Sequence, residues 1–275
     1  MAEYETLQYE ERDGVAFITM NRPEKHNSFN RVMQAEMQQT WIALRDNDDV
    51  RAVVLTGAGD EAFCTGIDRG EAIVHFVETE GARQVGVGRV AGGVMFDDVG
   101  RKICPKQCDL WKPVIAAVNG IACAGALYLL GECDIIIAAE HATFFDPHVS
   151  YGMVSAFEGI HLLQKLPLGE TLRLVLMGAH ERMSAQRAYE VGLVSEIVPP
   201  ADLQARAAQL AARIAMSPSL VVQASLQAVW AGHEHSRRQA LAIAHTFVTV
   251  ASNYDDIAAG QELFEGGHRI EWELR

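Results

Sequence analysis

Apolar runs of strand length alternate with helical patterns through the first part of the chain, and this alternation limits the folds that the chain can adopt. Residues 14–20 are rich in β-branched and aromatic side chains and stop at an Asn-Arg-Pro turn, which predicts a strand. Residues 29–44 carry apolar side chains at helical spacing, which predicts an amphipathic helix. Further strand-sized runs cover residues 52–56, 113–118 and 134–139. This rhythm is typical of crossover units around a sheet that is buried on both faces, so the sequence predicts an α/β fold.

The chain after Pro199 has a different pattern. Helical patterns with apolar stripes follow one another there, over residues 201–216, 219–232, 235–251 and 255–266. We therefore divide the chain into a core of residues 1–199 and a smaller helical region of residues 200–275.

Two turns of small residues in the core are predicted to bind an anionic oxygen. Residues 119–134 begin with such a turn and run into an apolar helix, and the first N–H groups of a helix have no partner within it. Residues 62–68 form a second small-residue turn soon after the strand at residues 52–56. Because two N–H donors can bind one carbonyl oxygen, we predict an oxyanion hole.

These turns occur in order with two further motifs, Asn-Arg-Pro-Glu-Lys-His-Asn at residues 21–27 and Met-Ser-Ala-Gln-Arg-Ala-Tyr-Glu-Val-Gly-Leu-Val at residues 183–194. In order and spacing the four segments resemble the crotonase (enoyl-CoA hydratase/isomerase) family, over about residues 5–270. The resemblance implies the ClpP/crotonase fold, a spiral of ββα units whose C-terminal helices help to form trimers or dimers of trimers. It also implies an acyl-CoA substrate, with coenzyme A as part of the substrate and no permanently bound cofactor. By resemblance, the oxyanion donors are the backbone N–H groups of Ile67 and Gly125.

The net charge of the chain limits the kinds of partner that it can bind. A formal net charge of −13 argues against nucleic acid or an anionic membrane surface as the main partner. A polyanion such as coenzyme A would then need locally basic groups, for which Arg22, Lys25 and His26 are the candidates. The expected coenzyme A contacts, turn residues included, are Lys25, His26, Ala62, Cys64 and Asp68.

The chain departs from the family where hydratases carry their two catalytic glutamates. Counting back from Asp134 and forward from Gly125, the first position holds Tyr128. The run Phe-Phe-Asp-Pro-His at residues 144–148 places His148 at the second. With both carboxylates missing, the resemblance supports the fold and thioester binding better than it supports the addition of water.

The two replacements can still carry chemistry. The imidazole of His148 titrates near neutral pH and could take or deliver a proton beside the thioester, unless it is only a packed histidine bonded to a carbonyl. The phenol of Tyr128 is a poor base at neutral pH, but it could donate a proton or a hydrogen bond, and it could equally be a packed side chain.

Other acids could substitute for the missing glutamates. Glu158 could supply a carboxylate, or it could be an ordinary acid in the first turn of a helix. Asp146, as a partner that orients His148, and His75, as a flap residue, are weaker candidates. Glu132 lies one helical turn beyond Tyr128, and we expect it to lie too deep.

Residues 68–111 form a long, Gly-containing segment without a clear period, which predicts a mobile, partly helical flap over the site. Its apolar side chains suggest an apolar acyl group. They are Ile73, Val74, Phe76 and residues 94–96.

The five cysteines form an odd set, and three lie in apolar segments, which predicts reduced, buried thiols. Cys104 and Cys108 have loop-like spacing, but no second Cys or His pair is near them in the sequence, so we predict no metal site. The acidic N-terminus and the strand-sized apolar runs predict a cytoplasmic protein without a membrane span.

Three functions remain open from the sequence. The first is an acyl-CoA enzyme of the hydratase/isomerase type, in which His148 transfers protons with Tyr128 or Glu158. The second is a crotonase-like hydrolase of a β-diketone C–C bond or of a thioester, in which a histidine paired with an acid activates water. The third is an acyl-CoA binding protein without catalysis.

Overall fold

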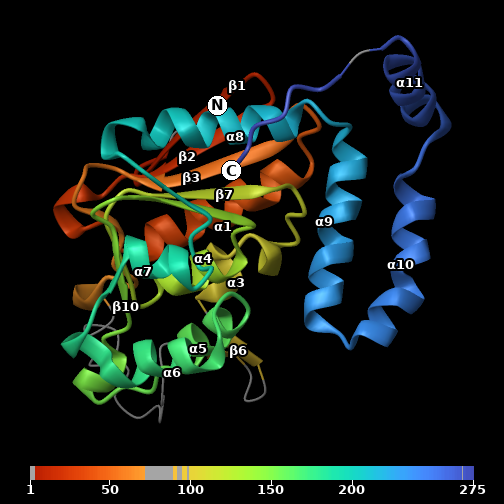
Figure 1. Cartoon of the computed structure of the whole chain (residues 1–275). Helices are drawn as coiled ribbons and strands as arrows, with labels where there is room; N and C mark the ends of the chain where they lie inside the picture. Colours follow the sequence, from red (N-terminus) through yellow and green to blue (C-terminus); the bar gives the residue numbers. More distant parts are fainter. Residues whose placement is uncertain (1–3, 72–88, 92–94, 98, 268) are drawn as a thin grey trace. The chain divides into compact units, whose positions relative to one another are not determined.

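The apolar runs of the sequence form the strands of a six-stranded sheet (Figure 1). The computed structural model describes residues 4–71, 89–91, 95–97, 99–267 and 269–275. The chain divides into two compact units, Met1–Ala215 and Met216–Arg275, and each is described by itself. In the first unit the strand order of this sheet is β1-β2-β3-β7-β9-β12. The strands are β1 (Leu7–Arg12), β2 (Val15–Met20), β3 (Ala52–Gly57), β7 (Val114–Val118), β9 (Ile135–Ala139) and β12 (Glu196–Val198).

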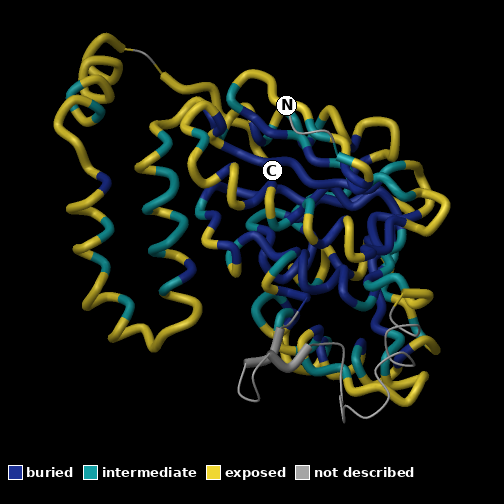
Figure 2. The backbone as a smooth tube through the Cα atoms, turned by 180° about the vertical axis from the view of Figure 1, so that it is seen from behind, coloured by how far each residue is buried: buried dark blue, intermediate teal, exposed yellow. Residues whose placement is uncertain are grey.

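This sheet is parallel except for the hairpin of β1 and β2, and it is buried on both faces. Every residue of β3 and β7 is buried, and the tube of Figure 2 is dark blue through the middle of the first unit. One face packs on α1 (Arg31–Arg45), through side chains such as Met37 and Trp41. The other face packs on α8 (Leu203–Ala215), through Ala207 and Ala211. The predicted α/β class is therefore confirmed.

Helix α8 belongs to the first unit because its alanine stripe lies on the sheet. The sequence-based division at residue 199 placed this helix with the C-terminal region, whereas the contacts divide the chain after Ala215. The small side chains of the stripe let the helix approach the strands closely, so a helical pattern alone does not mark the boundary.

A second, four-stranded sheet has the order β11-β10-β8-β4. Its strands are β4 (Ala62–Cys64), β8 (Ile121–Cys123), β10 (Thr143–Phe145) and β11 (Met183–Ser184). Its helices are α4 (Ala126–Glu132), α5 (Phe157–Leu163), α6 (Leu168–Met177) and α7 (Ala185–Glu190). The chain passes from β7 to β8 and then α4, and from β9 to β10 and then α5, so each ββα unit spans both sheets. This arrangement is the predicted spiral of ββα units.

Short elements connect these units. They are η1 (Pro23–Lys25), β5 (Arg89–Ala91), β6 (Met95–Asp97), α3 (Gly100–Ile103), η2 (Lys106–Cys108), η3 (His148–Tyr151), η4 (Gly178–His180) and η5 (Pro200–Asp202). Much of the predicted flap lies outside the described residues, including His75, Ile73, Val74, Phe76 and Val94. Within it, β5 and β6 form an antiparallel pair.

The second unit contains three helices, α9 (Ser219–Glu234), α10 (Arg237–Ala251) and α11 (Tyr254–Glu265). A capping box at Ser236 begins α10, and the side chain of Asn253 caps α11. Several large apolar side chains of this unit are exposed, for example Leu241, Val250 and Phe264. Among the described residues, no single helix is long and apolar enough to cross a membrane, although α8 with η5 and α9 together pass that test by length and composition alone.

Asn27 ties the turn after β2 to the turn before β4. It is fully buried with a positive φ of 55°, a conformation that asparagine tolerates better than most residues. Its Nδ2 donates to the carbonyl oxygens of Ala58 and Ala62 at 2.9 and 2.8 Å, and its Oδ1 accepts from the N–H of Arg22 at 3.0 Å.

We expect Asn27→Ala to lower the free energy of unfolding by about 2–3 kcal/mol, because three hydrogen bonds are lost. The part-buried N–H of Arg22 and carbonyl of Ala58 lose this partner, whereas the carbonyl of Ala62 still accepts from Asn119 Nδ2 at 3.2 Å. Urea unfolding followed by circular dichroism measures this loss. The control is Gln39→Ala on the exposed side of α1, which should change stability by about 0.5 kcal/mol or less. An equal, small effect of both substitutions would contradict the role of Asn27.

Candidate functional site

The turn after β4 presents one predicted oxyanion donor. Gly66 has a φ of 83°, and a parallel bridge joins Phe29 to Ile67. In this bridge the N–H of Phe29 donates to Gly66 O at 2.8 Å, and the N–H of Asp68 donates to Phe29 O at 3.1 Å. Because polar groups alternate along extended backbone, the N–H of Ile67 points away from Phe29.

The turn after β8 brings the second predicted donor to the same place. Ala124 has a φ of 52°, and Gly125 follows it as the N-cap of α4. A Cβ built on Gly66 would lie 2.7 Å from Gly125 N and 2.9 Å from Ala124 Cβ. A Cβ on Gly125 would lie 2.5 Å from the Phe29 ring. The two turns therefore touch, and only glycine fits at both positions.

Arg22 holds the turn after β4 in place. Its guanidinium donates to Asp68 Oδ2 at 2.9 Å and to Ser28 O at 2.7 Å. Burial acts to raise the pKa of Asp68, but the hydrogen bonds from Arg22 and from the N–H of Gly70 outweigh burial and lower it. Asp68 thus serves as the partner of Arg22.

The other expected coenzyme A contacts divide into two groups. Lys25 and His26 are exposed, with His26 Nε2 3.1 Å from Glu61 Oε2, so both can meet a ligand. Ala62 and Cys64 are buried, and the carbonyl of Ala62 already accepts from Asn27. Burial also raises the pKa of the Cys64 thiol.

His148 lies between two buried carboxylates. It begins η3, directly after Pro147, and its Nδ1 lies 2.5 Å from Asp146 Oδ1 and 3.5 Å from Glu158 Oε1. Asp146 is fully buried and Glu158 is 2% exposed, whereas the His148 side chain is 16% exposed. Both carboxylates face Nδ1, so Nε2 is the nitrogen left for other partners.

The pKa values of His148 and Glu158 are both raised, but for different reasons. Burial acts to lower the pKa of His148, but the hydrogen bond to Asp146 and the charge of Glu158 raise it overall. Burial raises the pKa of Glu158, and the charge of His148 and a hydrogen bond with Tyr128 only partly offset this. The pKa of Glu158 is thus raised above the usual value for a glutamate. The second carboxylate oxygen of Asp146 is buried without a hydrogen-bond partner among the described residues.

Tyr128 joins this cluster from α4. It is 6% exposed, and its ring lies 6.0 Å from Phe157 and 5.5 Å from His161. The structure therefore brings Tyr128, His148 and Glu158 together, with Asp146 as the group that orients the imidazole. Glu132 lies apart from them, because its carboxylate accepts the backbone N–H groups of η2.

Sequence reasoning ranked Asp146 low and did not consider His161. Asp146 is two residues before His148 in the same turn, which was the available signal. His161 lies one helical turn after Glu158 on α5, and burial lowers its pKa to about 4, so its imidazole is neutral at physiological pH.

We expect Asp146→Asn to lower the pKa of His148, because the substitution removes the negative charge that stabilises the imidazolium. In the wild-type chain the folded pKa is above the unfolded value of about 6.5. The stability from this group is therefore fully present below the unfolded pKa and is lost as the pH rises through the folded pKa. NMR titration of the His148 ring protons measures the change, with Asp202→Asn as the control. An unchanged titration would contradict the pairing.

Comparison with known proteins agrees with this architecture. A sequence model described as enoyl-CoA hydratase/isomerase matches residues 10–275. The chain is 33% identical to (E)-benzylidenesuccinyl-CoA hydratase of Thauera aromatica, covering 91% of this chain and 92% of that protein. It is 31% identical to 1,2-epoxyphenylacetyl-CoA isomerase of Escherichia coli, with coverage of 91% and 92%.

Solved structures give the same result. An enoyl-CoA hydratase/isomerase from Mycobacterium paratuberculosis superposes with a TM-score of 0.82 at 34% identity, covering 99% of this chain and 100% of that chain. An enoyl-CoA hydratase from Bacillus anthracis superposes with a TM-score of 0.80 at 26% identity, with coverage of 96% and 97%. The chain belongs to the enoyl-CoA hydratase/isomerase (crotonase) family of acyl-CoA enzymes.

Proposed function

We propose that this enzyme transfers protons at the acyl group of an enoyl-CoA thioester, as a hydratase or isomerase, with His148 as the main acid/base group. The observation that carries the proposal is the buried arrangement of His148 with Asp146, Glu158 and Tyr128. By resemblance, two of its members, Tyr128 and His148, stand at the positions at which family hydratases carry their glutamates.

The thioester carbonyl would be bound by the N–H groups of Ile67 and Gly125. Removal of an α-proton, or addition at the β-carbon, moves negative charge onto this oxygen. Donors fixed in advance stabilise that charge, and one such donor is worth about 2.7–4 kcal/mol in the transition state. The contact between the two turns supports this assignment, because it holds both donors without reorganisation.

Within the cluster the roles follow from the partners. Asp146 holds Nδ1 of His148, which leaves Nε2 to take or deliver the proton. Glu158 lies 3.5 Å from the same imidazole nitrogen. It can act as the second acid/base group because its pKa is raised. Tyr128 is a hydrogen-bond partner of Glu158, so we assign it a positioning role.

The names of two relatives suggest the acyl group. Both (E)-benzylidenesuccinyl-CoA hydratase and 1,2-epoxyphenylacetyl-CoA isomerase are named for aryl-substituted acyl-CoA thioesters. We therefore propose an aryl-substituted enoyl-CoA as a candidate substrate, to be compared with straight-chain substrates. The apolar side chains of Ile73, Val74 and Phe76, although outside the described residues, are of a kind that fits such a group.

Hydrolysis is the second candidate function, and the contact of Asp146 with His148 favours it. A histidine oriented by a buried carboxylate can activate water for attack on a carbonyl. Such an enzyme would release a carboxylic acid from a thioester or a β-diketone, whereas a hydratase only adds water to the double bond.

We also propose a homotrimer or a dimer of trimers formed with the help of residues 216–275. The exposed apolar side chains of α10 and α11 support this, since such surfaces are usually covered in assemblies. Light scattering after gel filtration would determine the number of chains.

We expect His148→Ala to lower kcat/KM by about 10²–10⁴-fold on the best substrate, because the proton-transfer group is lost. The substrates are crotonyl-CoA, a longer enoyl-CoA and cinnamoyl-CoA, with products identified by mass. Tyr128→Phe should cause a smaller loss, because Glu158 keeps its contact with His148. His245→Ala changes an exposed histidine of α10 and is the control.

The outcomes separate the candidates. Unchanged turnover in both His148→Ala and Tyr128→Phe would refute the assigned roles. A carboxylic acid product would instead establish the hydrolase, and saturable binding without product would favour a binding protein.

A further inference from the structure

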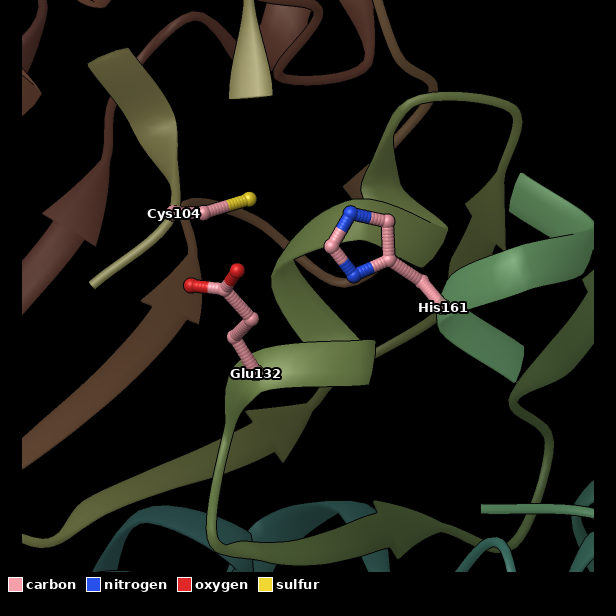
Figure 3. Close-up of side chains that lie close together, drawn as sticks. All are labelled: Cys104, Glu132 and His161. Carbon is pink, nitrogen blue, oxygen red and sulfur yellow. The ribbon is translucent and has the colours of Figure 1, made fainter. Parts of the chain in front are cut away.

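Three side chains that play no part in the proposed reaction meet next to the His148 cluster, two of them buried and the third, that of His161, half-buried. Cys104 directly follows α3, Glu132 ends α4 and His161 lies in α5. Figure 3 shows the thiol, the carboxylate and the imidazole facing one another, and their ligand atoms all lie within 4.8 Å of one another. A thiolate, an imidazole and a carboxylate are ligands that zinc binds in proteins. We infer that Cys104, Glu132 and His161 bind one Zn²⁺ ion.

Gly131 makes room for one of the ligands. A Cβ at this position would lie 2.5 Å from Cβ of His161 and 3.0 Å from its Nδ1. Glycine in a helix costs about 1 kcal/mol relative to alanine, so it is an unfavourable choice within α4. The close approach of His161 requires it, and this approach brings the imidazole to Glu132 and Cys104.

Glu132 is already oriented as a metal ligand would be. Its Oε2 accepts the N–H groups of Lys106 and Gln107 at 2.8 and 3.1 Å, and its Oε1 accepts from Gln107 Nε2 at 3.1 Å. A carboxylate offers about four lone-pair positions, so three donors leave one for a metal. Hydrogen bonds of this kind fix ligating carboxylates and raise metal affinity.

The site would join elements that carry the proposed catalytic groups. Glu132 lies one turn after Tyr128 on α4, and His161 lies one turn after Glu158 on α5. A metal bound by both helices and by Cys104 would hold Tyr128 and Glu158 at a fixed separation. On binding, the thiol of Cys104 loses its proton to solvent as the sulfur–metal bond forms. The binding itself does not depend on which reaction the enzyme catalyses.

Titration of the full chain with Co²⁺, prepared without other metals, tests the site. Cobalt bound to a thiolate gives an intense sulfur-to-metal charge-transfer band. We expect this band to saturate at one Co²⁺ per chain and to disappear on addition of Zn²⁺, which binds such sites more tightly. The melting temperature of the chain should also rise as the Zn²⁺ concentration is increased. No charge-transfer band in the wild-type chain at a large excess of Co²⁺ would overturn the proposal.

Variants locate the ligands. Cys104→Ala and His161→Ala should each abolish the band, and Gln107→Ala should weaken Co²⁺ binding by about 10–100-fold through loss of the orienting hydrogen bond. Cys108→Ala and Cys133→Ala remove neighbouring buried thiols and should keep it. His148→Ala should also keep it, since the group of Asp146, His148 and Glu158 contains no sulfur. A band that survives in Cys104→Ala, or is lost in Cys108→Ala or Cys133→Ala, would also overturn the assignment. Circular dichroism would check that each variant is folded.

Discussion

The contact between the turns at Gly66 and Gly125 is the constraint on which the site depends. A side chain at either glycine would collide with the other turn or with Phe29. The two turns follow β4 and β8, which are adjacent parallel strands, so the register of the small sheet sets their separation. Asn27 and Arg22, which follow β2, hold the segment that contains the turn at Gly66 through hydrogen bonds to Ala62 and Asp68. The close packing of the two turns thus fixes the positions of two backbone N–H groups, those of Ile67 and Gly125.

Those side chains define a second constraint, which is electrostatic. The side chains of Asp146, Glu158 and His148 are in contact and have little exposure to solvent. A buried carboxylate needs a charged or hydrogen-bonding partner. The imidazole of His148 is the partner of both carboxylates, so the protonation of Glu158 depends on that of His148. The proposed chemistry therefore belongs to the cluster rather than to one residue.

Much of the fold follows from the sequence, because the strands at residues 14–20, 52–56, 113–118 and 134–139 are apolar and strand-sized. The boundary of the C-terminal region does not follow, since α8 has a helical pattern but packs on the sheet through alanines. The contact of His148 with Asp146 is local and could be weighed from spacing. The meeting of Cys104, Glu132 and His161 could not, because these residues come from three elements and no ligand pair is close in the sequence.

The segment from β10 to α5 has a consequence for how such an enzyme can change. Asp146, His148 and Glu158 all lie on this one continuous stretch, whereas the turns that carry the proposed oxyanion donors come from elsewhere. Substitutions in fewer than twenty consecutive residues could therefore exchange the proposed acid/base groups without altering the turns proposed to bind the thioester. A family built in this way can acquire a new reaction by local sequence drift, without rebuilding the pocket that recognises its substrates.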